Sequence, residues 1–114
     1  MQESLRLRHA GDFQRLRRVG QVYRHHALIL SVASNNLTHN RYGFITAKYL
    51  GNAVRRNRIR RQLREAIRLL HPGLYPGRDM VFIVRPALIG QPFQMIQRIV
   101  YELCEKANMV EKEL

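Results

Sequence analysis

The residues of this sequence best suited to chemistry are arginines, and seven of them lie within 19 residues. The segment NAVRRNRIRRQLREAIRLL, residues 52–70, holds these seven arginines with a single acid, Glu65, and no lysine. Arginine presents a planar fork of N–H donors that suits bidentate contacts with phosphate and stacking on nucleobases. The segment therefore predicts a phosphate-binding surface.

The other polar residues do not form a pattern typical of a catalytic centre. A metal-dependent nuclease needs clustered carboxylates to hold its ions, and Asp12, Glu65 and Asp79 fall on separate expected elements. None of the five histidines has the spacing of a zinc site with the single cysteine, Cys104. No phosphate-binding loop or dinucleotide fingerprint occurs. These features indicate a binding module with no catalytic residue and no metal site of its own.

The composition is that of one folded and strongly basic domain. The 114 residues are 46% apolar and carry 20 Lys and Arg against 8 Asp and Glu, a formal net charge of +12. We expect residues 1–114 to form a single domain. Its charge attracts polyanions, with nucleic acid as the first candidate and an anionic membrane as the second. Residues 1–10 lack the apolar run of a signal peptide, and no membrane-spanning run follows, so we expect a cytoplasmic protein.

Two helices are expected outside the basic segment. Asp12 is expected to cap a helix over residues 13–19, which Gly20 ends. A second helix is expected over residues 93–110, where apolar residues recur every three or four positions. This periodicity places Cys104 on the buried face of that helix.

Three strands are expected, at residues 21–33, 41–47 and 78–86. Gly43, inside the second strand, marks either a bulge or a close approach of another group. Tyr42 and Tyr49 flank this strand, and we expect both to pack at the sheet edge, with stacking on bases as the alternative. Together with the helices, the pattern predicts an α+β domain.

The basic segment is expected to be a two-faced helix capped by Asn52. At about 100° per residue, one arc holds the apolar side chains Ile59, Leu63, Ala66, Ile67 and Leu70. The opposite side holds Asn57, Arg61, Arg64 and Arg68, flanked by Arg58 and Arg60. Like charges four residues apart destabilise a helix by a few tenths of a kcal/mol per pair. The unbalanced ridge therefore favours a polyanion site over a merely solvated face.

The segment GNAVRRNRIRRQLRE, residues 51–65, resembles the signature of the bacterial ribonuclease P protein family, whose Arg-Asn-Arg core falls at residues 56–58. The stretches RHAGDF, YGFITAKYLGNAV and RDMVFIVRP lie where that family has its elements, so the resemblance covers about residues 5–110. It implies a two-layer α/β sandwich of about four strands and three helices in the order αβββαβα, with the fourth strand coming from a split of residues 21–33. It also implies a left-handed crossover through the basic helix, whereas crossovers are generally right-handed.

The resemblance implies a function as well. Members of that family bind a large catalytic RNA, which removes the 5′ leader of precursor tRNA by metal-assisted hydrolysis and itself supplies the active site. The implied partners are therefore the catalytic ribonuclease P RNA and precursor tRNA, with no membrane and no obligate protein partner. The protein alone is expected to hold no cofactor, and Mg²⁺ is expected to act in the ribonucleoprotein holoenzyme.

Two sets of binding residues follow from the resemblance. The RNA-facing set would be Asn52, Arg55, Arg56, Asn57, Arg58, Arg60, Arg61, Arg64 and Arg68. The cleft for the single-stranded leader would be lined by Phe13, Arg17, Lys48, Leu28 and Leu30. The two leucines are expected on the exposed face of the sheet. The family often has a second aromatic where this chain has Arg17, whose guanidinium plane can also stack on a base.

Other interpretations of the basic helix remain open from the sequence. A general or ribosomal RNA-binding protein would show no preference for a 5′ leader. A stand-alone nuclease lacks its carboxylate cluster. A helix-turn-helix DNA-binding protein would need a companion helix just upstream, where a strand is expected. A membrane-surface or calmodulin-binding helix would need an exposed Trp or Phe that the segment lacks.

Overall fold

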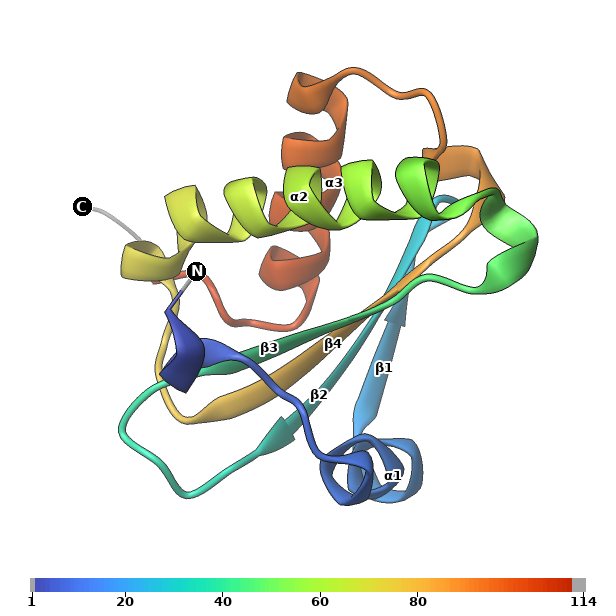
Figure 1. The fold of residues 1–114 in the computed structure, drawn as a ribbon. Helices are drawn as coiled ribbons and strands as arrows, with labels where there is room; N and C mark the ends of the chain where they lie inside the picture. The colour runs from blue at the N-terminus through green and yellow to red at the C-terminus, as the bar shows by residue number, and fades with distance from the viewer. Residues whose placement is uncertain (1, 112–114) are drawn as a thin grey trace.

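The computed structural model describes residues 2–111, which form three α-helices and four strands. In chain order these are α1 (Ala10–Val19), β1 (Gln21–Arg24), β2 (Leu28–Ser34), β3 (Arg41–Ile45), α2 (Ala53–Leu70), β4 (Arg78–Val84) and α3 (Phe93–Lys106). Short 3-10 turns lie at Glu3–Leu5, Lys48–Leu50, His71–Gly73 and Pro86–Leu88. Helices α2 and α3 cover one face of the sheet and α1 lies across the other (Figure 1). The predicted α+β class and the order αβββαβα are confirmed.

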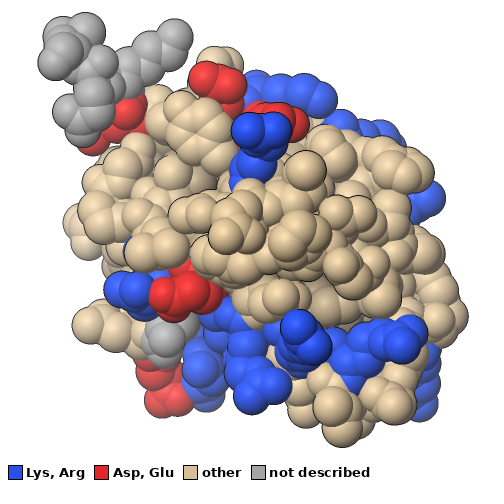
Figure 2. Space-filling view, turned by 90° about the horizontal axis from the view of Figure 1, so that it is seen from above, with Lys and Arg blue, Asp and Glu red and all other residues tan. Residues whose placement is uncertain are grey.

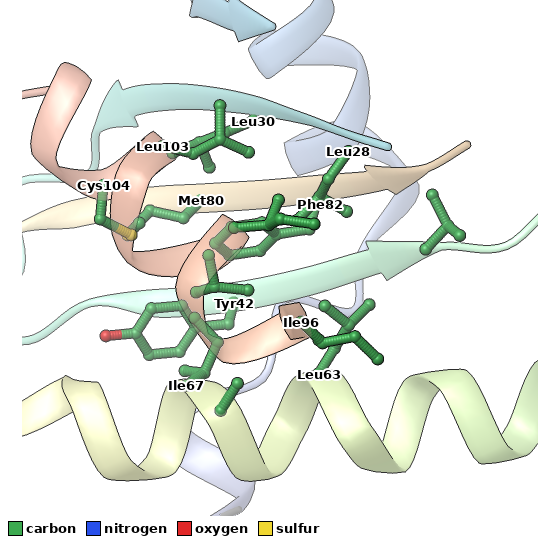
Figure 3. Packing of buried hydrophobic residues seen from close by; sticks show 14 of the residues in the cluster. Leu28, Leu30, Tyr42, Leu63, Ile67, Met80, Phe82, Ile96, Leu103 and Cys104 are labelled. Atoms are coloured by element: carbon green, nitrogen blue, oxygen red, sulfur yellow. The ribbon is translucent and has the colours of Figure 1, made fainter. Parts of the chain in front are cut away.

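The sheet has the strand order β1-β2-β4-β3. Strands β1 and β2 pair antiparallel, as do β2 and β4, whereas β3 and β4 are parallel. Parallel neighbours need a crossover connection, and here the chain passes from β3 through α2 to β4. In Figure 3 the helices α2 and α3 lie in front of the sheet, β3 and β4 both point to the right, and β4 lies above β3. The connection through α2 is therefore left-handed, as the resemblance implied. The edge strand β3 therefore lies next to the basic helix in both sequence and space.

The expected long strand at residues 21–33 divides in two, as the resemblance implied. The break falls at residues 25–27, where the backbone N–H of Ala27 donates to Nδ1 of His25 at 3.0 Å. The N–H of His25 then donates to the carbonyl of Leu28 at 2.9 Å, which closes the turn between β1 and β2. Because the turn is stabilised by a histidine and contains neither Gly nor Pro, composition alone did not reveal it.

Two helix ends differ from expectation. Asp12 does not cap α1: the helix begins at Ala10 with His9 in the capping position, and Asp12 lies in its first turn. There the carboxylate pairs with Arg41 at 3.5 Å, close to the positive end of the helix dipole. The expected end of the last helix at residue 110 is also wrong, because α3 stops at Lys106 and Asn108 adopts a φ of 56°. The end of α1 at Gly20 is confirmed.

The main core lies between the sheet and the two helices α2 and α3 (Figure 3). Phe82 is at its centre, opposite Leu30 on β2 and Phe44 on β3, and its ring stacks on that of Phe44 at 6.0 Å. Cys104 is buried in this core, which confirms its predicted position on the inner face of the last helix. This packing holds α2 against the sheet and leaves the opposite side of that helix free.

A smaller core lies on the other face of the sheet, under α1. Leu16 of α1 and Leu7 of the preceding segment are buried there against Ala33 and Val81. Three half-buried apolar residues surround this core: Phe13, Ile45 and Ile83. Since α1 is only ten residues long, it covers part of this face and leaves an apolar strip of sheet beside it. We also call this strip, which includes Ile45 and Ile83, the open sheet face.

A buried carboxylate joins α1 to the sheet. Asp79 of β4 is 0% exposed, and it accepts hydrogen bonds from Nε and Nη2 of Arg41 at 2.9 and 2.8 Å. Asn35 donates to the same carboxylate at 3.0 Å, and Arg15 of α1 donates to its other oxygen. The bond to Asp79 raises the pKa of Arg41. Asp79 is therefore a structural anchor that positions α1, a role that its place in the sequence did not indicate.

Candidate nucleic-acid interface

Helix α2 carries the arginine segment on its outer side, as the helical wheel predicted. Asn52 caps the helix by accepting the N–H of Arg55 at 2.9 Å, which confirms the predicted cap. The inner stripe is also confirmed: Ile59, Leu63, Ala66 and Ile67 are buried, and Leu70 is half-buried. Because these apolar residues fix the rotation of α2, the arginines between them must face solvent.

We call the outer side of this helix the arginine surface. It comprises all nine residues of the predicted RNA-facing set: Asn52, Arg55, Arg56, Asn57, Arg58, Arg60, Arg61, Arg64 and Arg68. All are exposed except three half-buried arginines, at positions 56, 60 and 64. Figure 2, which views the molecule from the side of α2 and α3, shows a band of Lys and Arg along the lower edge with few acidic residues among them, and further Lys and Arg along the upper right edge.

Within residues 2–111, most charges of the arginine surface have no acidic partner. The exception is Arg68, which donates to Glu65 from Nε at 3.0 Å and from Nη2 at 2.6 Å. The bond lowers the pKa of Glu65 and raises the pKa of Arg68. Arg56 and Arg60 instead bind neutral oxygens, the Gly51 carbonyl at 3.2 Å and the Asn57 side chain at 2.5 Å. The surface therefore keeps a strong positive potential that is available to an anion.

The structure adds a basic residue that the sequence did not point to. Arg6 lies in the segment before α1, and its positive charge acts on Arg64 across the edge of β3. Partial burial first, and then the charges of Arg6 and Arg60, lower the pKa of Arg64. The alternation Arg6-Leu7-Arg8, with the leucine buried, is a sequence signal of extended backbone, and this segment makes a single parallel bridge from Arg6 to Tyr42.

Phe13, the first residue of the predicted leader cleft, lies on the face of the sheet that α1 partly covers. A Cβ on Gly43 of β3 would lie 2.8 Å from Cζ of Phe13, so only glycine allows this ring to lie against the strand. The expected close approach at Gly43 is thereby confirmed. Arg17 on α1 and Lys48 in the turn before α2 are exposed.

The expectation that Leu28 and Leu30 lie on the exposed face of the sheet is wrong. Both are 0% exposed and point into the main core against α3 (Figure 3). Side chains alternate along a strand, so the residues of β2 on the α1 face are Ile29, Ser31 and Ala33. Ile29 is half-buried beside its partner Ile83 on β4 and is the apolar residue that the sequence analysis missed.

The two tyrosines next to β3 differ from each other. Tyr42 packs as expected: it is buried, its hydroxyl lies 2.6 Å from Nδ1 of His71, and burial raises its pKa to about 12. Tyr49 is 70% exposed, so its expected packing at the sheet edge is wrong. Its ring is presented to solvent next to Lys48 in the turn that leads into α2.

Within residues 2–111, no group of three or more His, Cys, Asp or Glu side chains is close enough to hold a metal ion. No helix in this range is long and apolar enough to cross a membrane. The candidate binding surfaces of the described chain are the arginine surface and the apolar strip of sheet beside α1.

The fold and these two surfaces define a small α+β domain of the polyanion-binding class, with a basic helix packed next to a partly open sheet face. The comparisons with known proteins identify the family within that class. The family model for Ribonuclease P matches residues 1–108, and the chain belongs to the ribonuclease P protein family. Its members are the protein subunit of the endoribonuclease that matures the 5′ end of tRNA, and this chain is such an RNA-binding subunit.

Individual relatives agree with this assignment. The chain is 47% identical over 112 residues to the ribonuclease P protein component of Roseiflexus castenholzii, covering 97% of this chain and 92% of that protein. It is 33% identical to the component of Natranaerobius thermophilus over 114 residues, covering 100% and 99%.

Solved structures agree on the fold. The ribonuclease P protein of Staphylococcus aureus superposes with a TM-score of 0.87 at 26% identity, covering 94% of this chain and 98% of that one. The protein from Thermotoga maritima gives 0.81 at 25% identity, covering 88% and 96%. A general or ribosomal RNA-binding protein is not favoured by these findings.

Proposed function

We propose that this subunit binds the catalytic RNA through the arginine surface and holds the 5′ leader of precursor tRNA on the open sheet face beside α1. The observation that carries the proposal is the imbalance of charge on α2, which contains seven arginines and a single acidic residue. Proteins rarely leave so many like charges on one helix face without a partner, because the charges repel each other. Phosphates of RNA would relieve this repulsion.

Contacts of these arginines with RNA would release counterions from the phosphate backbone. The exposed guanidinium groups of Arg55, Arg58 and Arg61 suit phosphate directly, since each presents a fork of donors. Asn57 adds a neutral donor and acceptor in the middle of the surface. We expect such contacts to position the RNA, because phosphate contacts carry no sequence information.

The open sheet face suits a single strand. Phe13, Ile29, Ile45 and Ile83 form a half-buried apolar floor on which unpaired bases can pack. Arg17 at the rim adds a positive charge for the backbone. A double helix keeps its bases stacked inside and would not use such a floor. The arrangement thus supports binding of the single-stranded leader on the open sheet face. Folded RNA would bind on the arginine surface.

The hydrolysis itself is assigned to the RNA. We propose that the Mg²⁺ ions of the holoenzyme are held by RNA phosphates and that the protein positions the substrate. The nearby arginines neutralise backbone charge, and this lowers the Mg²⁺ concentration that the complex needs to fold and to bind its substrate. The proposed place of action is the cytoplasm, where bacterial precursor tRNA is made.

Cleavage of a precursor tRNA at low Mg²⁺ tests the proposal in three samples: protein alone, a bacterial ribonuclease P RNA alone, and the two together. We expect cleavage only in the mixture. Cleavage by the protein alone would show a missed active site. Tight binding of the RNA without any stimulation of cleavage would favour a general RNA-binding role.

A charge reversal then tests the surface. Arg61→Glu should weaken binding to the RNA subunit, because Arg61 is exposed in the middle of the arginine surface. Arg98→Glu is the matched control, since Arg98 is an exposed arginine on α3. Equal losses in the two variants would show that only net charge matters and that α2 is not the contact face.

A further inference from the structure

A cavity of about 650 Å³ lies at the C-terminal end of α2, beside the 3-10 turn Glu3–Leu5 (Figure 1). Its floor is apolar and includes Leu5, the buried Ile67 and the ring of Tyr42. Figure 3 shows this ring beside Ile67, on the side of the sheet that the helices α2 and α3 cover. The open sheet face lies on the opposite side, next to α1, so the cavity is separate from the proposed leader site.

One histidine presents a hydrogen-bond donor to this cavity. The hydroxyl of Tyr42 lies 2.6 Å from Nδ1 of His71 and accepts a hydrogen bond from Asn40 at 3.3 Å. Within residues 2–111, Nδ1 of His71 is the only acceptor for the proton of this hydroxyl. Burial raises the pKa of Tyr42 to about 12, so this proton stays on the oxygen at neutral pH. A neutral His71 therefore carries its own proton on Nε2 and donates from there.

A second histidine presents an acceptor. Nε2 of His39 lies 3.1 Å from the carbonyl oxygen of Ser4, which can only accept, so Nε2 carries the proton. Nδ1 of the neutral ring is then left as an acceptor for a ligand. Because His39 and His71 both line the cavity, it offers one ring donor and one ring acceptor beside an apolar floor.

A cation also lines the cavity. The exposed Arg68 binds Glu65 through its Nε and Nη2 atoms. Its Nη1 makes no hydrogen bond to any residue that the structure describes, and it can donate to a phosphate oxygen. The formal net charge of +12 on the whole chain favours an anionic ligand over a cationic one.

We infer that this cavity binds one adenine nucleotide, with the base on the apolar floor and the phosphate on Nη1 of Arg68. Adenine presents an acceptor at N7 next to a donor at N6, which matches the donor on His71 and the acceptor on His39. The volume of about 650 Å³ is within the range of roughly 300–1,000 Å³ that is typical of small-molecule sites. The nucleotide is either a free one or an unpaired one of the RNA subunit, since both have this chemistry.

Calorimetric titration of the protein with AMP tests the inference, and inosine monophosphate is the matched ligand. Inosine monophosphate has a carbonyl in place of the N6 amino group, so it keeps the phosphate and loses the donor. We expect it to bind about tenfold more weakly than AMP, the typical effect of losing one hydrogen bond at a buried acceptor. Absence of AMP binding, or equal binding of the two nucleotides, would overturn the inference.

Two variants place the nucleotide in this cavity. Ser4→Trp should fill the cavity and lower the affinity for AMP at least tenfold, whereas Ser34→Trp, at an exposed serine that does not line it, should leave this affinity unchanged. Arg68→Gln should weaken binding of AMP and leave binding of adenosine, which has no phosphate, as in the wild type. Unchanged AMP affinity in Ser4→Trp would overturn the inference, as would equal losses of AMP and adenosine affinity in Arg68→Gln.

The holoenzyme distinguishes the two sources of the nucleotide. If the ligand is a free nucleotide, the holoenzyme should bind AMP as the protein alone does. If it is an unpaired adenosine of the RNA subunit, the holoenzyme should not bind AMP, and Ser4→Trp should weaken binding of the RNA subunit. Loss of AMP binding only on addition of precursor tRNA would assign the cavity to the leader and overturn the inference. The RNA-subunit source rests on the proposed function, whose failure would show separately as a wild-type protein that does not bind the RNA subunit.

Discussion

The contact between Gly43 and Phe13 offers a sharp test of how the leader cleft is built. An added Cβ at position 43 would lie 2.8 Å from Cζ and 2.9 Å from Cε1 of Phe13, and 3.3 Å from Cβ of Leu7. Carbon atoms in favourable contact are about 3.5–4.0 Å apart. In Gly43→Ala the ring of Phe13 must therefore move by roughly 1 Å, or β3 must move away from it.

The loss of stability in Gly43→Ala depends on how easily the ring of Phe13 can move. Overpacking a core typically destabilises a protein by about 1–3 kcal/mol. Phe13 is half-buried and can move toward solvent, so we expect Gly43→Ala to lie near the lower end of that range. Urea unfolding of the protein measures this cost. The displaced ring should also weaken binding of precursor tRNA by the holoenzyme while the affinity for the RNA subunit stays unchanged.

Two further variants separate the clash from a general effect of alanine. Phe13→Leu removes the ring atoms that clash, so adding it to Gly43→Ala should recover part of the lost stability, with a coupling of about 0.5–3 kcal/mol. Gly11→Ala is the control: it lies in α1, and an added Cβ there meets nothing within 4 Å. If Gly43→Ala were as stable and as active as the wild type, Phe13 would not lie against β3.

Three other predictions concern charge and burial. Arg61→Ala should lower the salt dependence of RNA-subunit binding by about one unit or less in log–log slope, and Arg68→Ala by less, because Arg68 already bonds Glu65. Unchanged slopes in both, measured by titration over a salt series, would place the RNA on another face. Asp79→Ala should destabilise the fold by about 3–5 kcal/mol in urea unfolding, since it removes the buried carboxylate that binds Arg15 and Arg41 and leaves Arg41 only its longer contact with Asp12. A loss no larger than that of Glu65→Ala would contradict the anchoring role. Burial raises the pKa of the Cys104 thiol to about 12, above its unfolded value of about 8.5. Its contribution to stability is therefore complete below pH 8.5 or so and is lost as the pH rises toward 12. Thiol reagents at pH 8 should label it only after unfolding, and rapid labelling of the native protein would refute its burial.

The arginine surface could be predicted from the local sequence pattern of α2. The spacing of apolar residues in α2 determines which side of the helix packs, and the remaining positions must then face solvent. The cap at Asn52 and the inner stripe from Ile59 to Ile67 follow from the same local rules. The family signature, the class of partner and the α+β architecture were accessible for the same reason, because each depends on residues close together in the chain.

The position of the leader cleft could not be predicted from local patterns, because it depends on contacts between residues that are distant in the chain. The run from Ala27 to Ala33 is apolar at both odd and even positions, so alternation does not reveal which side of β2 stays open. The structure decides it: Leu28 and Leu30 face the helices, and Ile29 faces the side that α1 covers only in part. Arg6 meets Arg64 only because the first segment pairs with the edge of β3. The sequence by itself determined the chemistry of the basic helix and its partner, whereas only tertiary packing, which joins residues distant in the chain, decided where a single strand can bind.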